Sequence, residues 1–80
     1  MIREKIREYI LKNFNISPDD KEFTDEINLF DYGYVDSFGA ASIIAYIEQE
    51  FSISVTQKDL MLYPMTSIDQ LAEFVNTKKV

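Results

Sequence analysis

The sequence of 80 residues contains no cysteine, no histidine and no tryptophan. The absence of cysteine excludes disulfides and thiolate-ligated metals. The absence of histidine removes the commonest metal ligand and the side chain best suited to proton transfer near neutral pH. Catalysis by a serine–histidine or cysteine–histidine pair is therefore impossible within this chain.

The chain also lacks long apolar runs and an excess of positive charge. No apolar stretch approaches the roughly 20 residues of a membrane span, and the charged N-terminal segment does not resemble a secretory signal, so we expect a cytoplasmic protein. Fourteen acidic and eight basic residues give a net charge of −6, which argues against nucleic acid as a partner. We expect one small domain over residues 1–80, present as a monomer.

The acidic residues are unevenly distributed. Between Glu22 and Gln57 there is no lysine or arginine. The acidic residues of this base-free segment are Glu22, Asp25, Glu26, Asp31, Asp36, Glu48 and Glu50. Such a segment can simply keep a surface soluble. Because Ser37 lies within it, we favour a docking surface for basic patches on other proteins.

Three segments repeat apolar residues at the spacing of an amphipathic helix. The first begins at Ile2 and ends before Pro18, the second runs from about Ser37 to Ser52, and the last follows Ser67, which forms a capping-box pattern with Gln70. We expect the buried stripes to be Ile2, Ile6, Tyr9 and Ile10; Ala40, Ala41, Ile43, Ile44, Ile47 and Phe51; and Ile68, Leu71, Ala72 and Val75.

A short helix and a long loop complete the predicted fold. Residues 57–62 suffice for one or two helical turns, and the loop before Ser37 carries enough apolar residues to pack on the core. We interpret the apolar cluster Met61, Leu62, Tyr63 and Met65 as a cover for the core, the alternative being that some of them face outward and meet a partner. The predicted class is all-α: a four-helix bundle of three principal helices and one short one.

Ser37 is the main candidate for a functional residue. It follows Asp36, the expected helix N-cap, at the point where a turn-like segment containing Gly33 gives way to the second helix. The unpaired N–H groups and the dipole of a helix N-terminus favour a negative group such as a phosphate. Since the chain lacks an evident general base, a serine in this position suits attachment of a phosphate-linked arm better than catalysis.

The stretch from Leu29 to Gly39, Leu-Phe-Asp-Tyr-Gly-Tyr-Val-Asp-Ser-Phe-Gly, together with the apolar helix that follows, resembles the acyl and peptidyl carrier proteins. The family's motif is an Asp-Ser-Leu-like tripeptide that opens the second helix, and the resemblance covers essentially the whole chain. It implies a stand-alone carrier bundle with no enzymatic activity, in which a phosphopantetheinyl transferase attaches 4′-phosphopantetheine from coenzyme A to Ser37. It also implies that Asp36 caps the helix beside the arm.

The resemblance further implies that the arm's thiol carries acyl or aminoacyl groups as thioesters, from an acyl or aminoacyl ligase to downstream transferases. Fatty-acid carriers line the second helix with acidic residues. The matching residues here are Asp36, Gly39, Ser42, Glu48 and Gln49. Because only two of these are acidic, steering by a strongly basic partner should be weaker, which argues against a general role in fatty-acid synthesis.

Two alternatives to an acyl carrier remain open. The Asp-Ser-Phe-Gly variant at positions 36–39 is similar to the D-alanyl carrier proteins of teichoic-acid D-alanylation, although the tryptophan usual there is missing. The other is a helical interaction module without an arm, which the exposed setting expected for Ser37 disfavours. A channel beside Ile44 and Ile47 could hold an aliphatic chain, whereas a small aminoacyl cargo would need none.

Enzymatic and metal sites have weaker support. The carboxylate pairs Asp19/Asp20 and Asp25/Glu26 fall in a predicted loop without an evident cleft to raise the pKa of one member. The acidic residues also do not follow the ligand spacing of a calcium-binding loop.

Overall fold

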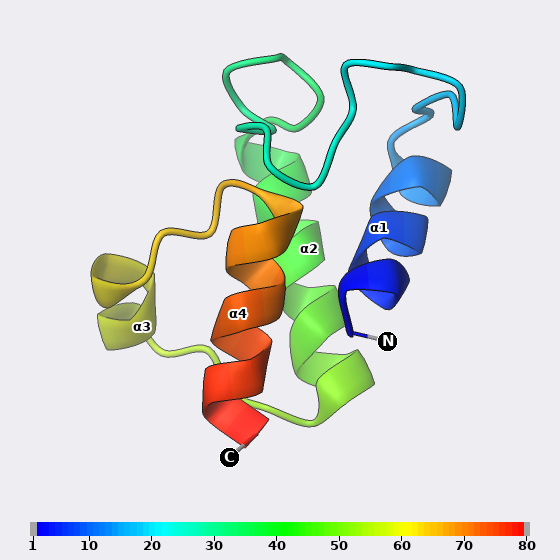
Figure 1. Cartoon of the computed structure of the whole chain (residues 1–80). Coiled ribbons are helices and arrows are strands. Elements are labelled where there is room, and N and C mark those ends of the chain that lie inside the picture. The colour runs from blue at the N-terminus through cyan, green and yellow to red at the C-terminus, as the bar shows by residue number, and fades with distance from the viewer. Residues whose placement is uncertain (1, 80) are drawn as a thin grey trace.

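The computed structural model describes residues 2–79, and within them it consists of four helices and no strand. The helices are α1 (Ile2–Asn13), α2 (Ser37–Phe51), α3 (Gln57–Leu62) and α4 (Ile68–Lys79) (Figure 1). Three are long and α3 is short, which confirms the predicted all-α bundle with a long loop between the first two helices. In this part of the chain no helix is long and apolar enough to cross a membrane.

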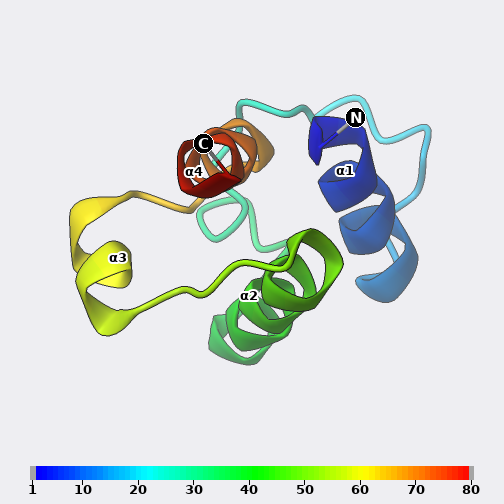
Figure 2. The ribbon, with the colours of Figure 1, turned by 90° about the horizontal axis from the view of Figure 1, so that it is seen from below.

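The core lies between α1, α2 and α4. Figure 2 shows these three helices around a common centre, with α3 to one side. The buried helical residues are Ile6 and Ile10 from α1; Ile43, Ile47 and Phe51 from α2; and Ile68, Leu71, Ala72, Phe74 and Val75 from α4. Each large apolar side chain contributes about 1.5–3 kcal/mol when it is fully buried. The helical spacing of these residues therefore decides which faces meet.

The long loop between α1 and α2 packs against the helices, as predicted. Phe23, Leu29 and Val35 are buried in the core. The Leu29 N–H donates a hydrogen bond of 2.8 Å to the carbonyl of Thr66, which lies just before α4. The loop is therefore attached to the bundle at several points along its length.

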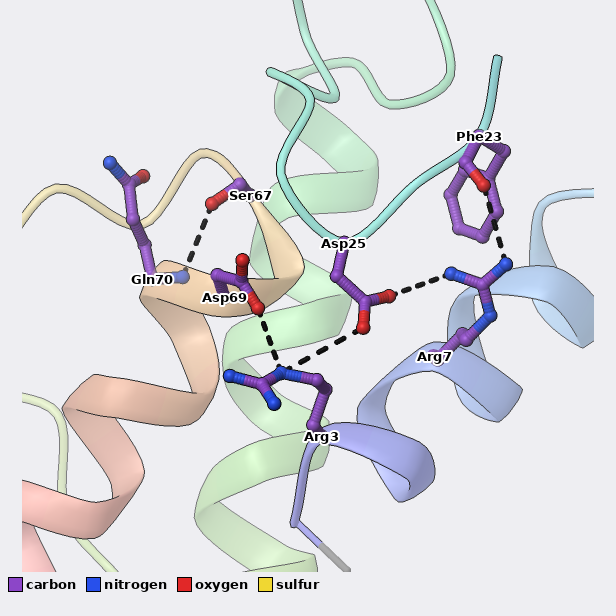
Figure 3. Close-up of polar contacts among 7 residues, drawn as sticks. All are labelled: Arg3, Arg7, Phe23, Asp25, Ser67, Asp69 and Gln70. Atoms are coloured by element: carbon purple, nitrogen blue, oxygen red, sulfur yellow. Dashed lines mark hydrogen bonds and ion pairs between the residues drawn. The ribbon is translucent and has the colours of Figure 1, made fainter. Parts of the chain in front are cut away.

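Asp25 joins this loop to two helices (Figure 3). Its carboxylate accepts a hydrogen bond of 2.7 Å from Arg7 of α1 and lies 3.7 Å from Nε of Arg3, which also pairs with Asp69 of α4 at 2.7 Å. The Asp69 N–H donates to the Asp25 carbonyl at 2.9 Å. The Arg7 guanidinium also lies over the ring of Phe23, 4.8 Å from its centroid. Together these contacts fix the loop against α1 and α4.

The structure corrects two predictions about which side chains are buried. Ala41 is exposed, because α2 buries the face that carries Gly39, Ile43 and Ile47. Met61 and Leu62, which we interpreted as a cover for the core, are 84% and 62% exposed. These two residues therefore face outward, whereas their contact with a partner stays a prediction. From the same cluster, Met65 does pack against the core, and Tyr63 contacts the ring of Phe74.

Two helix ends differ in detail from the prediction. Helix α1 ends at Asn13, before the predicted proline stop, and Asn15 follows in the left-handed conformation with φ of 54°. At the start of α4, the Gln70 N–H donates to Ser67 Oγ at 3.1 Å, which confirms half of the capping box. The Gln70 side chain accepts hydrogen bonds from the N–H and hydroxyl of Thr66 instead of from Ser67.

Candidate functional site

Ser37 is the first residue of α2 and is exposed. Asp36 precedes it in an extended conformation, and its Oδ1 accepts a hydrogen bond of 2.8 Å from the Gly39 N–H. The Asp36 carbonyl accepts the Ala40 N–H at 2.9 Å, so the predicted N-cap is confirmed. The end of the helix macrodipole leaves partial positive charge beside the Ser37 hydroxyl.

A tight turn in the loop presents Ser37. The Leu29 carbonyl accepts hydrogen bonds from the N–H groups of both Tyr34 and Val35, at 3.0 and 3.2 Å. Gly33 lies in this turn with φ of 77°, a conformation that costs other residues more, as expected from the sequence. Because Leu29 and Val35 are both buried, the chain reaches Ser37 from a segment fixed in the core.

Gly39 brings the end of α1 against the start of α2, a role that sequence reasoning missed. The glycine is buried, and a Cβ added there would collide with the ring of Phe14 and lie 3.1 Å from Cγ1 of Val35. The Phe14 ring in turn meets Tyr9 edge-on, with a centroid distance of 6.5 Å. Only glycine allows this close approach, which positions the first turn of α2 and hence Ser37.

The surface beside Ser37 is aromatic and uncharged along the helix. Phe38, the next residue, is 87% exposed, and Tyr32 of the preceding turn is 55% exposed. No charged residue occurs in α2 between Ser37 and Ile47. Exposed large apolar residues beside a candidate site are typical of a protein contact surface.

The acidic residues of the base-free segment are largely engaged within the fold. Asp25 pairs with Arg7, Glu50 pairs with Lys5 at 3.0 Å, and Glu48 accepts the Val55 N–H at 2.9 Å. Asp36 caps α2. The exposed remainder is Glu22, Glu26 and Asp31. Docking to basic partners stays a prediction.

The residues around Ser37 offer little acid–base chemistry. Burial, together with the hydrogen bond that the Tyr34 hydroxyl donates to Asp20 at 2.8 Å, raises the pKa of Tyr34 to about 12. Tyr34 therefore stays protonated at neutral pH and cannot act as a base. Asp20 and Asp25, members of the two carboxylate pairs considered from the sequence, are held by Tyr34 and Arg7. Residues 2–79 contain no group of acidic side chains that could hold a metal ion.

An apolar cleft of about 240 Å³ begins one helical turn beyond Ser37. Ala40 and Ile44 of α2 line one side, and Leu60 of α3 and Tyr63 line another. Ile44 therefore borders a cleft, as the predicted channel required. Ile47, which we also expected beside it, is instead fully buried in the core.

Comparison with known proteins identifies the family. A family model described as a phosphopantetheine attachment site matches residues 4–75. The chain is also similar to probable polyketide synthase 10 of Dictyostelium discoideum, with 40% identity over 63 residues, which are 79% of this chain and 2% of that relative's length. Since the family model covers most of the chain, the protein belongs to the phosphopantetheine-attachment family, whose members carry covalently attached 4′-phosphopantetheine.

Proposed function

We propose that Ser37 Oγ bears the phosphopantetheine arm and that the chain is an acyl carrier without catalytic activity of its own. The observation that carries this proposal is the exposed serine hydroxyl at the N-terminus of α2, in a chain of the phosphopantetheine-attachment family.

The residues at this end of α2 fit a phosphodiester. A negative charge beside an exposed helix N-terminus is favoured by about 0.3–1 kcal/mol. Asp36 caps the helix through the Gly39 N–H, so the first turn keeps its shape while the hydroxyl of Ser37 faces solvent. When attached, the arm supplies the thiol that a chain without cysteine lacks.

The chain depends on partner enzymes for every chemical step. It contains no histidine, and Tyr34 stays protonated at neutral pH. We therefore expect a phosphopantetheinyl transferase to activate the Ser37 hydroxyl. An acyl or aminoacyl ligase would then load the thiol, and downstream transferases would remove the cargo. Phe38, beside the serine, is well exposed for contact with these enzymes.

The cleft favours an acyl cargo over D-alanine. Its lining is apolar apart from Thr66 and the hydroxyl of Tyr63, and it begins one turn from Ser37, so an aliphatic chain attached through the arm could fold back into it. A small aminoacyl group would gain little from such a space. The similarity to a protein named as a polyketide synthase also supports an acyl group. D-Alanyl transfer remains the second candidate because of the Asp-Ser-Phe-Gly sequence at 36–39.

The setting of the protein belongs to the same proposal. We place this carrier in the cytoplasm as a monomer. We take residues 1–80 as one carrier domain, because a single core joins the buried apolar residues of α1, α2, α4 and the loop between α1 and α2. An interaction module without an arm is the competing account, and the exposed hydroxyl of Ser37 counts against it.

The attachment test compares intact masses after incubation with coenzyme A and a broad-specificity phosphopantetheinyl transferase. The wild-type protein and a Ser42→Ala control should each gain one arm, and Ser37→Ala should gain none. Ser42 is a suitable control because it is an exposed serine on the same helix. No gain in the wild type would favour the arm-free module.

The cargo test measures the melting temperature of the protein loaded with acyl chains of increasing length or with D-alanine. A chain held in the cleft stabilises the folded state, so the melting temperature should rise with acyl length. An unchanged melting temperature across the acyl series would contradict sequestration and leave D-alanine as the better cargo.

A further inference from the structure

Helix α3 forms a wall of the apolar cleft although little apolar contact holds it in place. Leu60 of α3 and Tyr63, directly after it, line the cleft opposite Ala40 and Ile44 of α2. Of the six residues of α3, Asp59 alone is buried. Figures 1 and 2 both show the helix beside the three-helix core instead of within it. The position of this wall must therefore depend on contacts other than a buried apolar face.

The Asp59 carboxylate supplies several of these contacts. Its Oδ2 accepts hydrogen bonds from Nζ of Lys78 at 2.8 Å and from the Thr56 N–H at 3.0 Å. The Thr56 hydroxyl in turn accepts the Asp59 N–H at 3.1 Å, which completes a capping box. A single buried carboxylate thus caps α3 and ties it to the last turn of α4.

Further contacts hold Lys78 and the last turn of α4 in place. Its Nζ lies 5.9 Å from the centroid of the Phe74 ring, which also meets the ring of Tyr63 at a centroid distance of 5.3 Å. The neighbouring Lys79 donates to the carbonyl of Phe51 at 3.1 Å, so the same turn of α4 is attached to the end of α2. The end of α4 therefore holds both α2 and α3, which line the cleft.

We propose that the Asp59–Lys78 ion pair positions α3 as the wall of the cleft and so controls how easily an acyl chain enters and leaves. Its role for cargo rests on the proposed carrier function, whereas its role in closing the cleft does not. Lys78 is the informative residue of the pair. Replacing it removes the tie to α4 but leaves the capping box between Thr56 and Asp59 intact, so α3 can remain helical while its position is released.

The absence of native cysteine allows a direct test of cleft access. A single cysteine in place of Ala40 reports on the cleft, and one in place of the exposed Ala41 reports on reagent reactivity at the same helix. In the unmodified protein, Lys78→Gln should accelerate thiol labelling of Ala40→Cys roughly fivefold or more, the lower end of typical coupling effects. Labelling of Ala41→Cys should not change.

Two further variants separate positioning from general destabilisation. Lys78→Arg keeps the ion pair and should restore slow labelling of Ala40→Cys. Lys5→Gln removes the exposed Lys5–Glu50 pair between α1 and α2 and should leave the labelling rate unchanged. An unchanged rate in Lys78→Gln would overturn the proposal, and so would equal acceleration at positions 40 and 41.

The cargo arm of the experiment uses the acyl-loaded protein. Lys78→Gln should reduce the rise in melting temperature that a long acyl chain produces, and Lys5→Gln should not. If the protein accepts no arm, the proposed function fails while the labelling result still decides the role of Lys78 in closing the cleft. If the arm attaches but the acyl-dependent rise is the same in Lys78→Gln and wild type, only the cargo role of the ion pair is overturned.

Discussion

The ring of Phe14, just beyond α1, packs against the backbone of Gly39 in the first turn of α2. This contact joins the two helices at the end where Ser37 is exposed. It also explains why position 39 is glycine, whereas fatty-acid carriers usually have an acidic residue at the matching position. The site is therefore positioned by packing as well as by its cap.

This packing predicts an unusual effect of a glycine-to-alanine change. In an ordinary helix interior, alanine is favoured over glycine by about 0.5–1 kcal/mol. Gly39→Ala should instead lower the free energy of unfolding by about 1–3 kcal/mol, because the added methyl group overpacks the contact with Phe14. In a Phe14→Ala background the same change should be neutral or stabilising. Urea unfolding of the four proteins measures this coupling, and additive effects would contradict it.

The cap at Asp36 predicts a difference between two substitutions. Asp36→Ala removes the acceptor for the Gly39 N–H and should lower the free energy of unfolding by about 0.5–2 kcal/mol. Asp36→Asn retains an acceptor oxygen and should stay close to wild type. Chemical denaturation of both variants decides the point. Equal losses would mean that the charge of Asp36, and not its capping hydrogen bond, stabilises α2.

The exposure of Phe38 predicts an effect on partners without an effect on folding. Because the side chain is 87% exposed, Phe38→Ala should change the free energy of unfolding by no more than about 0.5 kcal/mol. Attachment of the arm by the transferase should nevertheless become slower. Gln49→Ala, an exposed change near the other end of α2, is the matched control. An unchanged attachment rate would exclude Phe38 from the transferase contact.

The sequence predicted the helices and the position of Ser37 at the start of α2 well, because both depend on local signals. Helical spacing placed α2 within one residue of its observed end, and α3 has the predicted bounds. The Asp36 cap follows from a short-range preference for aspartate at this position. The capping box of Thr56 and Asp59 was also available from the sequence as a Thr-x-x-Asp pattern, but it was missed.

The features that were not predicted depend on contacts between distant segments. No local pattern reveals that Phe14 will pack on Gly39 or that Lys78 will pair with Asp59. The exposure of Met61 was not predicted for the same reason. An apolar residue on a short helix is buried only if another element covers it, and no local signal in the sequence reports on that.

The Asp59–Lys78 pair predicts a pH dependence of stability. The hydrogen bond from Lys78, aided by the Thr56 N–H, holds the pKa of Asp59 below its ordinary value. A carboxyl group whose pKa is lowered in the folded state stabilises that state at pH values above the pKa of the unfolded chain, which is about 3.9 for aspartate. This contribution is lost as the pH falls through the lowered native pKa.

Urea unfolding of wild type and Asp59→Asn at several pH values isolates this contribution, because the other carboxylates are common to both proteins. The wild type should be more stable by a constant margin above about pH 5, and the margin should shrink below about pH 4. A margin that stays constant or grows in acid would contradict the predicted direction.

The most direct test of the central claim is to locate the arm by fragmentation mass spectrometry of the transferase-treated protein. The account predicts one phosphopantetheine per chain, found on the peptide that contains Ser37 and assigned to that residue, with the same result in Ser42→Ala. An arm on any other residue, or a protein that remains unmodified, would contradict the account.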